Sequence, residues 1–94
     1  SIREEAETKI LANNIQDFGE QKKKILVIDI TEADEEEKKK LRGAIKYFSG
    51  DKNNINVFVK MGEEERSCGA IYLTNEILEI FKEIIEKCEV KEIT

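Results

Sequence analysis

The sequence predicts an α+β domain with a ferredoxin-like βαββαβ order, in which four antiparallel strands carry two helices on one face. Three stretches favour this fold class. Residues 25–30 (ILVIDI) form a short apolar run rich in β-branched side chains, which is typical of a strand covered on both faces. Residues 55–61 (INVFVKM) alternate in the manner of a strand with two distinct faces. From Ile77 onward, apolar side chains recur at helical spacing.

The charged stretch after the first strand predicts the first helix, over residues 34–48. Thr31 is its candidate N-cap, and the acidic run Glu32–Glu37 suits the positive end of a helix dipole. Gly50 predicts the end of the helix. Gly43 lies inside it, where a glycine costs about 1 kcal/mol relative to alanine. We interpret Gly43 as a point of close approach between the helix and a strand.

The second half of the chain predicts a hairpin, a helix and a closing strand. Gly62–Glu65 is interpreted as a four-residue hairpin loop, followed by a return strand at residues 67–73. Thr74 or Asn75 is the candidate N-cap of the second helix. A last short strand is predicted at Val90–Ile93. The apolar stripe of the second helix consists of Ile77, Leu78, Phe81, Ile84, Ile85 and Cys88.

Alternation along the strands assigns each apolar side chain to one face of the sheet. The face beneath the helices is expected to hold Leu26, Ile28, Ile30, Ile55, Val57, Val59, Met61, Ile71 and Leu73. The opposite, open face is expected to hold Ile25, Val27, Phe58, Ala70 and Tyr72. An open face this apolar is unusual for a free monomer. We therefore expect the N-terminal segment, another domain or a partner to cover it, and these open-face residues are the candidate partner-binding site.

Residues 1–23 are predicted to form a segment apart from the domain at residues 24–94. The stretch KILANNI at residues 9–15 alternates weakly and resembles a strand. We expect residues 8–18 to pack on the open face of the sheet or to pair with a second chain, because an unpaired strand edge invites another strand.

The charge balance disfavours nucleic acid as a direct ligand. The 94-residue chain has 21 acidic and 16 basic side chains, which gives a formal net charge of −5. Residues 1–24 carry five acids and five bases, so the whole excess of acid lies on residues 25–94. Phosphate contacts normally need a positively charged surface. This distribution favours a protein partner over DNA or RNA.

The sequence offers little to a catalytic or metal site. It contains no histidine, which is the usual general base near neutral pH and a common zinc ligand. Cys68 and Cys88 lack metal-ligand spacing, and we expect reduced thiols of the core rather than a disulfide. Asp29 interrupts an apolar strand and is interpreted as lying at a sheet edge or at a strand end rather than as a catalytic carboxylate. The acidic runs Asp34–Glu37 and Glu63–Glu65 are interpreted as solvated surface. No catalytic residue, metal or cofactor is predicted.

Several stretches carry a resemblance to a known family. Gly50-Asp51 with Asn56-Val57-Phe58 is similar to a G-D-x-x-V-x-V/F motif that follows a helix, and Leu73–Leu78 (LTNEIL) is similar to a recurrent helix entry. Residues 24–93 thereby resemble the extreme C-terminal region of the bacterial replicative DNA polymerase III alpha subunit. Residues 2–18 (IREEAETKILANNIQDF) resemble the last strand of the OB domain that precedes this region.

The resemblance implies a piece of a DNA-directed DNA polymerase, a nucleotidyltransferase whose active site lies upstream and outside this chain. In that family the C-terminal region is associated with binding the tau subunit of the clamp loader. The implied function is therefore a non-catalytic domain for protein–protein interaction that tethers the polymerase to the clamp loader during DNA replication. The parent protein rather than this chain would contact DNA, no membrane would be involved, and the expected compartment is the bacterial cytoplasm.

Two other functions stay open. A single-stranded nucleic-acid-binding module would stack bases on Phe58 and Tyr72. A small regulatory ferredoxin-like domain would bind a metabolite and form a homodimer through its open sheet. The first alternative predicts a steep salt dependence of oligonucleotide binding. The second predicts thermal stabilisation by a small ligand.

Overall fold

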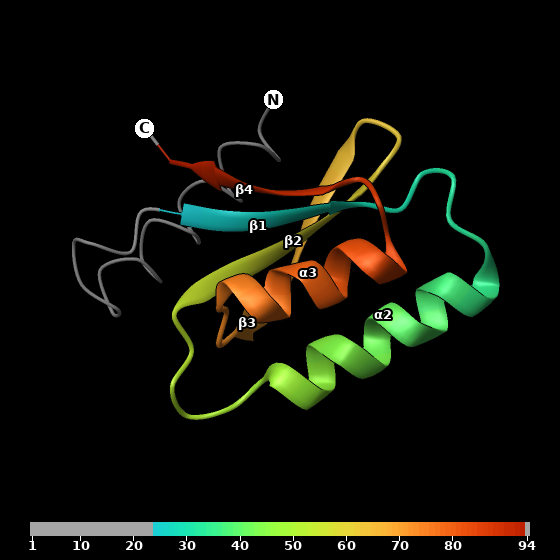
Figure 1. Cartoon of the computed structure of the whole chain (residues 1–94). Coiled ribbons are helices and arrows are strands. Elements are labelled where there is room, and N and C mark those ends of the chain that lie inside the picture. Colours follow the sequence, from blue (N-terminus) through green and yellow to red (C-terminus); the bar gives the residue numbers. More distant parts are fainter. Residues whose placement is uncertain (1–23, 94) are drawn as a thin grey trace.

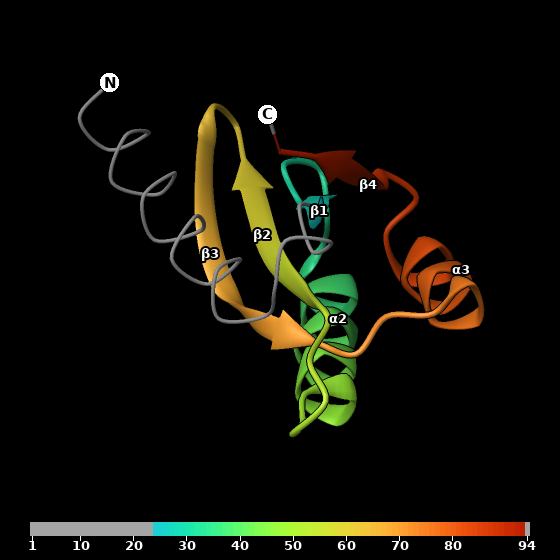
Figure 2. The same cartoon turned by 90° about the vertical axis from the view of Figure 1, so that its left-hand side faces the viewer.

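The computed structural model describes residues 24–93, which fold into a four-stranded sheet with two helices on one face (Figures 1 and 2). The elements are β1 (Lys24–Asp29), α2 (Glu35–Phe48), β2 (Ile55–Met61), β3 (Glu64–Ile71), α3 (Asn75–Ile84) and β4 (Cys88–Glu92). The βαββαβ order and the α+β fold class are confirmed. The predicted N-terminal segment at residues 1–23, with its expected strand pairing at residues 8–18, lies outside the described residues.

The strand order β3-β2-β1-β4 fits a ferredoxin-like arrangement, but the prediction of a wholly antiparallel sheet is wrong in one pairing. β1 and β2 are parallel neighbours, with Ile25 opposite Asn56 and Asp29 opposite Lys60. The β2–β3 and β1–β4 pairs are antiparallel, so the sheet is mixed. The reason is that α2 brings the chain back to the end of the sheet at which β1 begins. β2 can therefore run beside β1 in the same direction.

The main core lies between the sheet and the helices, as the alternation predicts. Its fully buried large side chains are Leu26, Ile28, Val57, Ile71 and Phe81. Four of them come from β1, β2 and β3, and Phe81 from α3. The helices remove these strand side chains from water. Burial of apolar surface is the chief favourable contribution to the free energy of folding of such a domain.

The N-cap of α2 is Asp34 rather than the predicted Thr31. Asp34 Oδ1 accepts a hydrogen bond from the Glu37 backbone N–H at 2.8 Å, and the Asp34 N–H donates to Glu37 Oε1 at 3.0 Å. This reciprocal pair is a capping box, and its D-x-x-E pattern stands in the sequence. Thr31 instead joins two loops, because its hydroxyl donates to Asp29 Oδ1 at 2.6 Å and accepts from the Gly62 N–H at 2.8 Å.

The boundaries of the hairpin and of the last strand also differ from the prediction. Met61 pairs with Glu64, so the turn contains only Gly62 and Glu63, and β3 begins earlier than expected. α3 begins after its N-cap Thr74 and ends at Ile84, so Cys88 is not part of the helical stripe. Cys88 opens β4 and pairs with Ile28. At Cys88 the pairing with β1 decides the structure, although the spacing of this residue would also fit the apolar stripe of α3.

Gly43 does not mark a close approach of α2 to a strand. It is exposed in the middle of the helix, and a Cβ atom built on it meets nothing within 4 Å. Gly43→Ala is therefore expected to raise the free energy of unfolding by about 1 kcal/mol, because alanine lowers the entropy cost of forming the helix. Urea unfolding followed by circular dichroism would measure this change.

Gly62→Ala is the matched control for this prediction. Gly62 also has open space around its Cβ position, but its φ of +62° lies in the left-handed region that alanine adopts poorly. The same measurement should show destabilisation at Gly62 and stabilisation at Gly43. Destabilisation by both substitutions would show that Gly43 has a packing role absent from this structure.

Candidate protein-binding site

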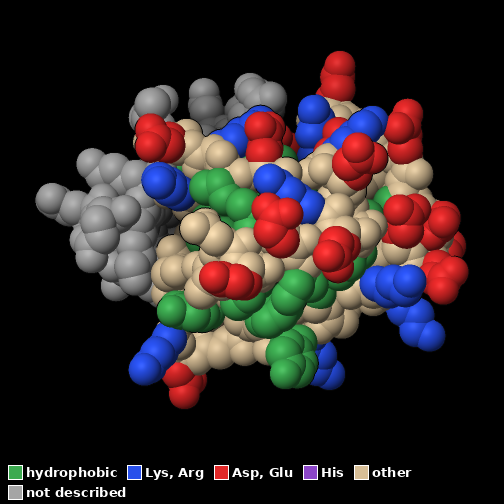
Figure 3. Space-filling model, in the orientation of Figure 1, with side chains coloured by type: hydrophobic (Ala, Val, Ile, Leu, Met, Phe, Trp, Pro, Cys, Tyr) green, Lys and Arg blue, Asp and Glu red, His purple; other side chains and the backbone are tan. Residues whose placement is uncertain are grey.

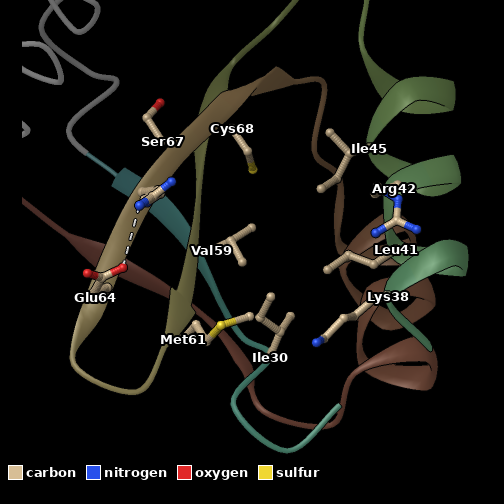
Figure 4. Close-up of a pocket in the computed structure, with 11 residues that line it drawn as sticks. Ile30, Lys38, Leu41, Arg42, Ile45, Val59, Met61, Glu64, Ser67 and Cys68 are labelled. Atoms are coloured by element: carbon tan, nitrogen blue, oxygen red, sulfur yellow. Dashed lines mark ion pairs between the residues drawn. The ribbon is translucent and has the colours of Figure 1, made fainter. Parts of the chain in front are cut away.

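A groove of about 510 Å³ runs between α2 and the β2–β3 hairpin. Its lining consists of Ile30, Lys38, Leu41, Arg42, Ile45, Val59, Met61, Glu64, Arg66, Ser67 and Cys68. In Figure 4, Leu41 and Ile45 point from α2 toward the hairpin, and Val59 and Met61 point from the hairpin toward α2. The facing side chains make an apolar floor.

The groove exists because the two helices leave much of β3 uncovered. Ile71 is the only residue of β3 that is buried, and most of the strand is exposed. On α2, the groove-lining positions Lys38, Leu41, Arg42 and Ile45 follow the i, i+3, i+4, i+7 spacing of one helix face. Met61 at the end of β2 is 50% exposed. An apolar strip on the helix-bearing face of the sheet thus stays open to solvent.

Cationic side chains border this apolar floor. Lys38 forms an ion pair with Glu35 at 3.6 Å, and Arg66 forms one with Glu64 at 3.7 Å, both partly solvated. Arg42 makes no ion pair with any residue in the range 24–93. From residue 38 to its end, α2 carries five basic side chains and no acidic one: Lys38, Lys39, Lys40, Arg42 and Lys46. This concentration of positive charge stands out in a chain of net charge −5.

A second apolar strip lies on the outer face of the helices. Figure 3 shows hydrophobic side chains gathered along the line between α2 and α3. Among the large apolar side chains of the two helices, Tyr47 of α2 is 81% exposed and Ile80 of α3 is 41% exposed. The Tyr47 ring packs edge-to-face on Phe48, with the centroids 5.1 Å apart, so an exposed aromatic side chain is held in place.

The residues predicted for the open face are only partly brought together. Val27 and Phe58 are each 4% exposed and form a small cluster with Ile25 and Ile93 on the side of the sheet away from the helices. Ala70 is half-buried opposite Asn56 on β2, next to this cluster. Tyr72 follows the end of β3 and is 47% exposed. The partner-binding role of these residues stays a prediction.

Both cysteines have free thiols, as expected, but only Cys88 belongs to the core. Cys68 is an exposed residue of β3 whose sulfur turns into the groove and donates a hydrogen bond to the Val57 carbonyl at 3.4 Å. Desolvation raises the pKa of the Cys68 thiol to about 11, and desolvation is also the main cause of the raised pKa of Cys88. A thiol held protonated in this way is a poor nucleophile.

Asp29 is the last residue of β1, which is an inner strand, so of the two predicted positions the structure shows the strand end and not the sheet edge. Its carboxylate accepts hydrogen bonds from the Thr31 hydroxyl at 2.6 Å and from the Thr31 backbone N–H at 2.9 Å. These two bonds hold the pKa of Asp29 below its usual value of 3.8, because they favour the charged form. Asp29 fixes the turn between β1 and α2.

The lowered pKa of Asp29 predicts a pH-dependent contribution to stability. A group whose pKa is depressed by folding stabilises the protein above its unfolded pKa, and this contribution is lost as the pH falls through its folded pKa. Asp29→Ala should therefore destabilise the chain more at neutral pH than at pH values well below 3.8. Urea unfolding at a series of pH values measures the difference from the wild type. Asp51→Ala, at an exposed turn, is the control, and an equal pH dependence for both variants would contradict the assignment.

Comparison with known proteins finds no matching family model, no similar curated protein and no similar solved structure. Within residues 24–93, no cluster of three or more His, Cys, Asp or Glu side chains could hold a metal ion. In the same range, no helix is long and apolar enough to span a membrane. The groove between α2 and the β2–β3 hairpin therefore offers apolar contacts and positive charge to a ligand.

Proposed function

We propose that residues 24–93 form a non-catalytic protein-binding domain, the C-terminal interaction domain of a bacterial replicative DNA polymerase alpha subunit. In this role the domain tethers the polymerase to the tau subunit of the clamp loader in the cytoplasm. The observation that supports protein binding is the open groove of about 510 Å³, whose apolar floor is bordered by cationic side chains. Interfaces between proteins combine an apolar centre with a polar, charged rim in this way.

The identity of the partner rests on the resemblance of residues 24–93 to the polymerase family. The βαββαβ order of the structure agrees with the order of motifs on which that resemblance depends. The stretch Gly50-Asp51 falls in the connection between α2 and β2, and Thr74 caps α3 within the stretch LTNEIL. A turn at Gly50-Asp51 and a helix entry at Thr74 are the two features on which the proposed family rests.

A nucleic-acid-binding module is the second candidate, and the five basic side chains of α2 favour it. Two observations weigh against it. The ring of Phe58, which would stack on a base, is 4% exposed, and the floor of the groove beside α2 is apolar. Positive charge beside an apolar floor suits an acidic protein surface better than a phosphate backbone.

Calorimetric titration of the 94-residue chain with the C-terminal part of a clamp-loader tau subunit from the same organism tests the proposal. A single-stranded oligonucleotide is the parallel ligand. Saturable binding of tau without binding of the oligonucleotide is expected. Binding of the oligonucleotide alone, with affinity falling steeply as salt is raised, would replace the proposal with the second candidate.

A further inference from the structure

We propose that the groove between α2 and the β2–β3 hairpin seats an amphipathic, acidic helix of a protein partner. The inference rests on the proposed function in one respect, namely that the domain binds a protein. It goes further by assigning the binding surface and the chemistry of the segment that fills it. That segment has aliphatic side chains at i, i+3 or i+4, and i+7, with carboxylates on either side of this stripe.

The position of the groove selects a helix over an extended strand. The groove lies in the helix layer of a two-layer fold, on the sheet face and beside α2, and not at the outer hydrogen-bonding edge of β3. An extended segment laid on the apolar side chains of Ile45, Val59 and Met61 would leave its backbone N–H and C=O groups without partners. A helix satisfies its own backbone and presents only side chains to such a floor.

The outer edge of β3 is poorly suited to strand addition. Gly69 has a φ of +117°, next to a register shift opposite Asn56–Phe58, and the first half of the strand is charged. Bulges and charges of this kind protect sheet edges from pairing with other chains. The irregular, charged edge of β3 is therefore a poorer docking surface for another chain than the apolar floor of the groove.

The charges around the floor select an acidic occupant. Lys38 and Arg42 border the groove on the α2 side and Arg66 on the hairpin side. Glu64 is the one acid of the lining and is already paired with Arg66 at 3.7 Å. A helix lying between these walls with carboxylates on both flanks would meet a cation on each side. A basic helix would meet repulsion from the same walls.

The open side of the groove disfavours a small metabolite as the occupant. Sites for small molecules usually enclose most of the ligand surface. Here Met61 is 50% exposed and Arg66 has a 74% exposed side chain, so a small molecule would stay largely in water. A helix can cover the strip along its length and bury it against its own apolar face.

Fluorescence anisotropy with labelled peptides tests the assignment on the whole 94-residue chain. The probe is a helical peptide of about 15 residues with leucine at the i, i+3, i+4, i+7 positions and glutamate on the flanks. The first control peptide has the same composition in scrambled order, and the second has lysine in place of every glutamate. Only the ordered acidic peptide is expected to bind, and its affinity should fall as salt is raised.

Variants of α2 and β2 locate the binding surface. Arg42→Glu reverses a charge that borders the groove and is expected to weaken peptide binding by about five- to tenfold. Lys40→Glu makes the same change in charge on an exposed residue of the same helix that does not line the groove, and should have little effect. Met61→Ser removes an exposed part of the floor without changing charge, and should weaken binding as well. Circular dichroism checks that each variant is folded.

Each outcome decides between the groove and its alternatives. Equal weakening by Lys40→Glu and Arg42→Glu would overturn the groove in favour of general attraction to a basic helix. Equal binding of the scrambled peptide, or stronger binding of an oligonucleotide, would overturn the amphipathic helix. Tau binding that is unchanged by Arg42→Glu and Met61→Ser would overturn the groove while leaving the proposed function intact. Groove-dependent peptide binding without tau binding would support the groove and refute the proposed partner.

Discussion

Replacing Phe81 with alanine is expected to lower the free energy of unfolding by about 3–5 kcal/mol, a cost typical of deleting a fully buried aromatic ring. Phe81 has no exposed surface and is the only fully buried large side chain that α3 contributes. Its ring also lies 6.0 Å from that of Phe48 on α2, so it joins both helices to the sheet. The substitution removes a fully buried ring that contacts the other helix and the core of the sheet.

Urea unfolding at equilibrium, followed by circular dichroism, would measure this loss. A 94-residue chain typically has a free energy of unfolding of about 5–14 kcal/mol, so the variant could lose most of its stability. Phe81→Leu keeps most of the volume and should cost less, which preserves a measurable transition. Tyr47→Ala removes an aromatic ring that is 81% exposed and should change stability by less than about 0.5 kcal/mol. Similar losses for Phe81→Ala and Tyr47→Ala would refute the packing described for α3.

The sequence contains enough to place the strands and helices and to assign their faces. Alternation in INVFVKM fixes which side chains of β2 face the helices, and Ile55 and Val57 are buried there as predicted. The amphipathic stripe of α3 likewise identifies Phe81 as a core residue. These features depend on the spacing of apolar and polar side chains along a short stretch of sequence, and this spacing can be read locally.

The neighbour of each strand could not be predicted in the same way. The alternation of β1 and β2 is satisfied equally by a sheet in which β3 separates them and by the observed sheet, in which they are parallel neighbours. Which strands become neighbours depends on how α2 crosses the sheet, and the side chains of β1 and β2 alone do not indicate the path of this connection. The distinction arises from long-range packing.

The groove was also missed, although the sequence holds a signal for it. In β3 (EERSCGAI) only the last residues are apolar, so most of the strand carries no side chain that requires cover from a helix. Together with the basic run on α2, this pattern indicates an uncovered strip beside a positively charged helix. The sequence patterns point instead to the apolar open-face residues, because local patterns show how apolar a face is and not which face stays exposed.

The second large effect is expected at Asn54, whose side chain extends the β2–β3 pairing beyond the end of the strands. Its Oδ1 accepts from the Leu73 N–H at 2.8 Å, and its Nδ2 donates to the Leu73 carbonyl at 3.0 Å. Asn54→Ala leaves both backbone groups of this half-buried residue without partners, and should lower the free energy of unfolding by about 2–3 kcal/mol. Asn54→Asp keeps the acceptor and loses the donor, so it tests the two bonds separately.

Hydrogen exchange at single amides distinguishes a local effect of Asn54→Ala from general destabilisation. Leu73 immediately precedes Thr74, whose hydroxyl caps α3 by accepting from the Ile77 N–H at 3.2 Å. If the Asn54 side chain positions this connection, exchange should accelerate at Leu73 and Ile77 by more than the global loss of stability explains. Asn53→Ala, which removes only one exposed bond to the Gly50 N–H, should leave both amides unchanged. Uniform acceleration across all amides of Asn54→Ala would show instead that the two bonds stabilise the domain as a whole without positioning the start of α3.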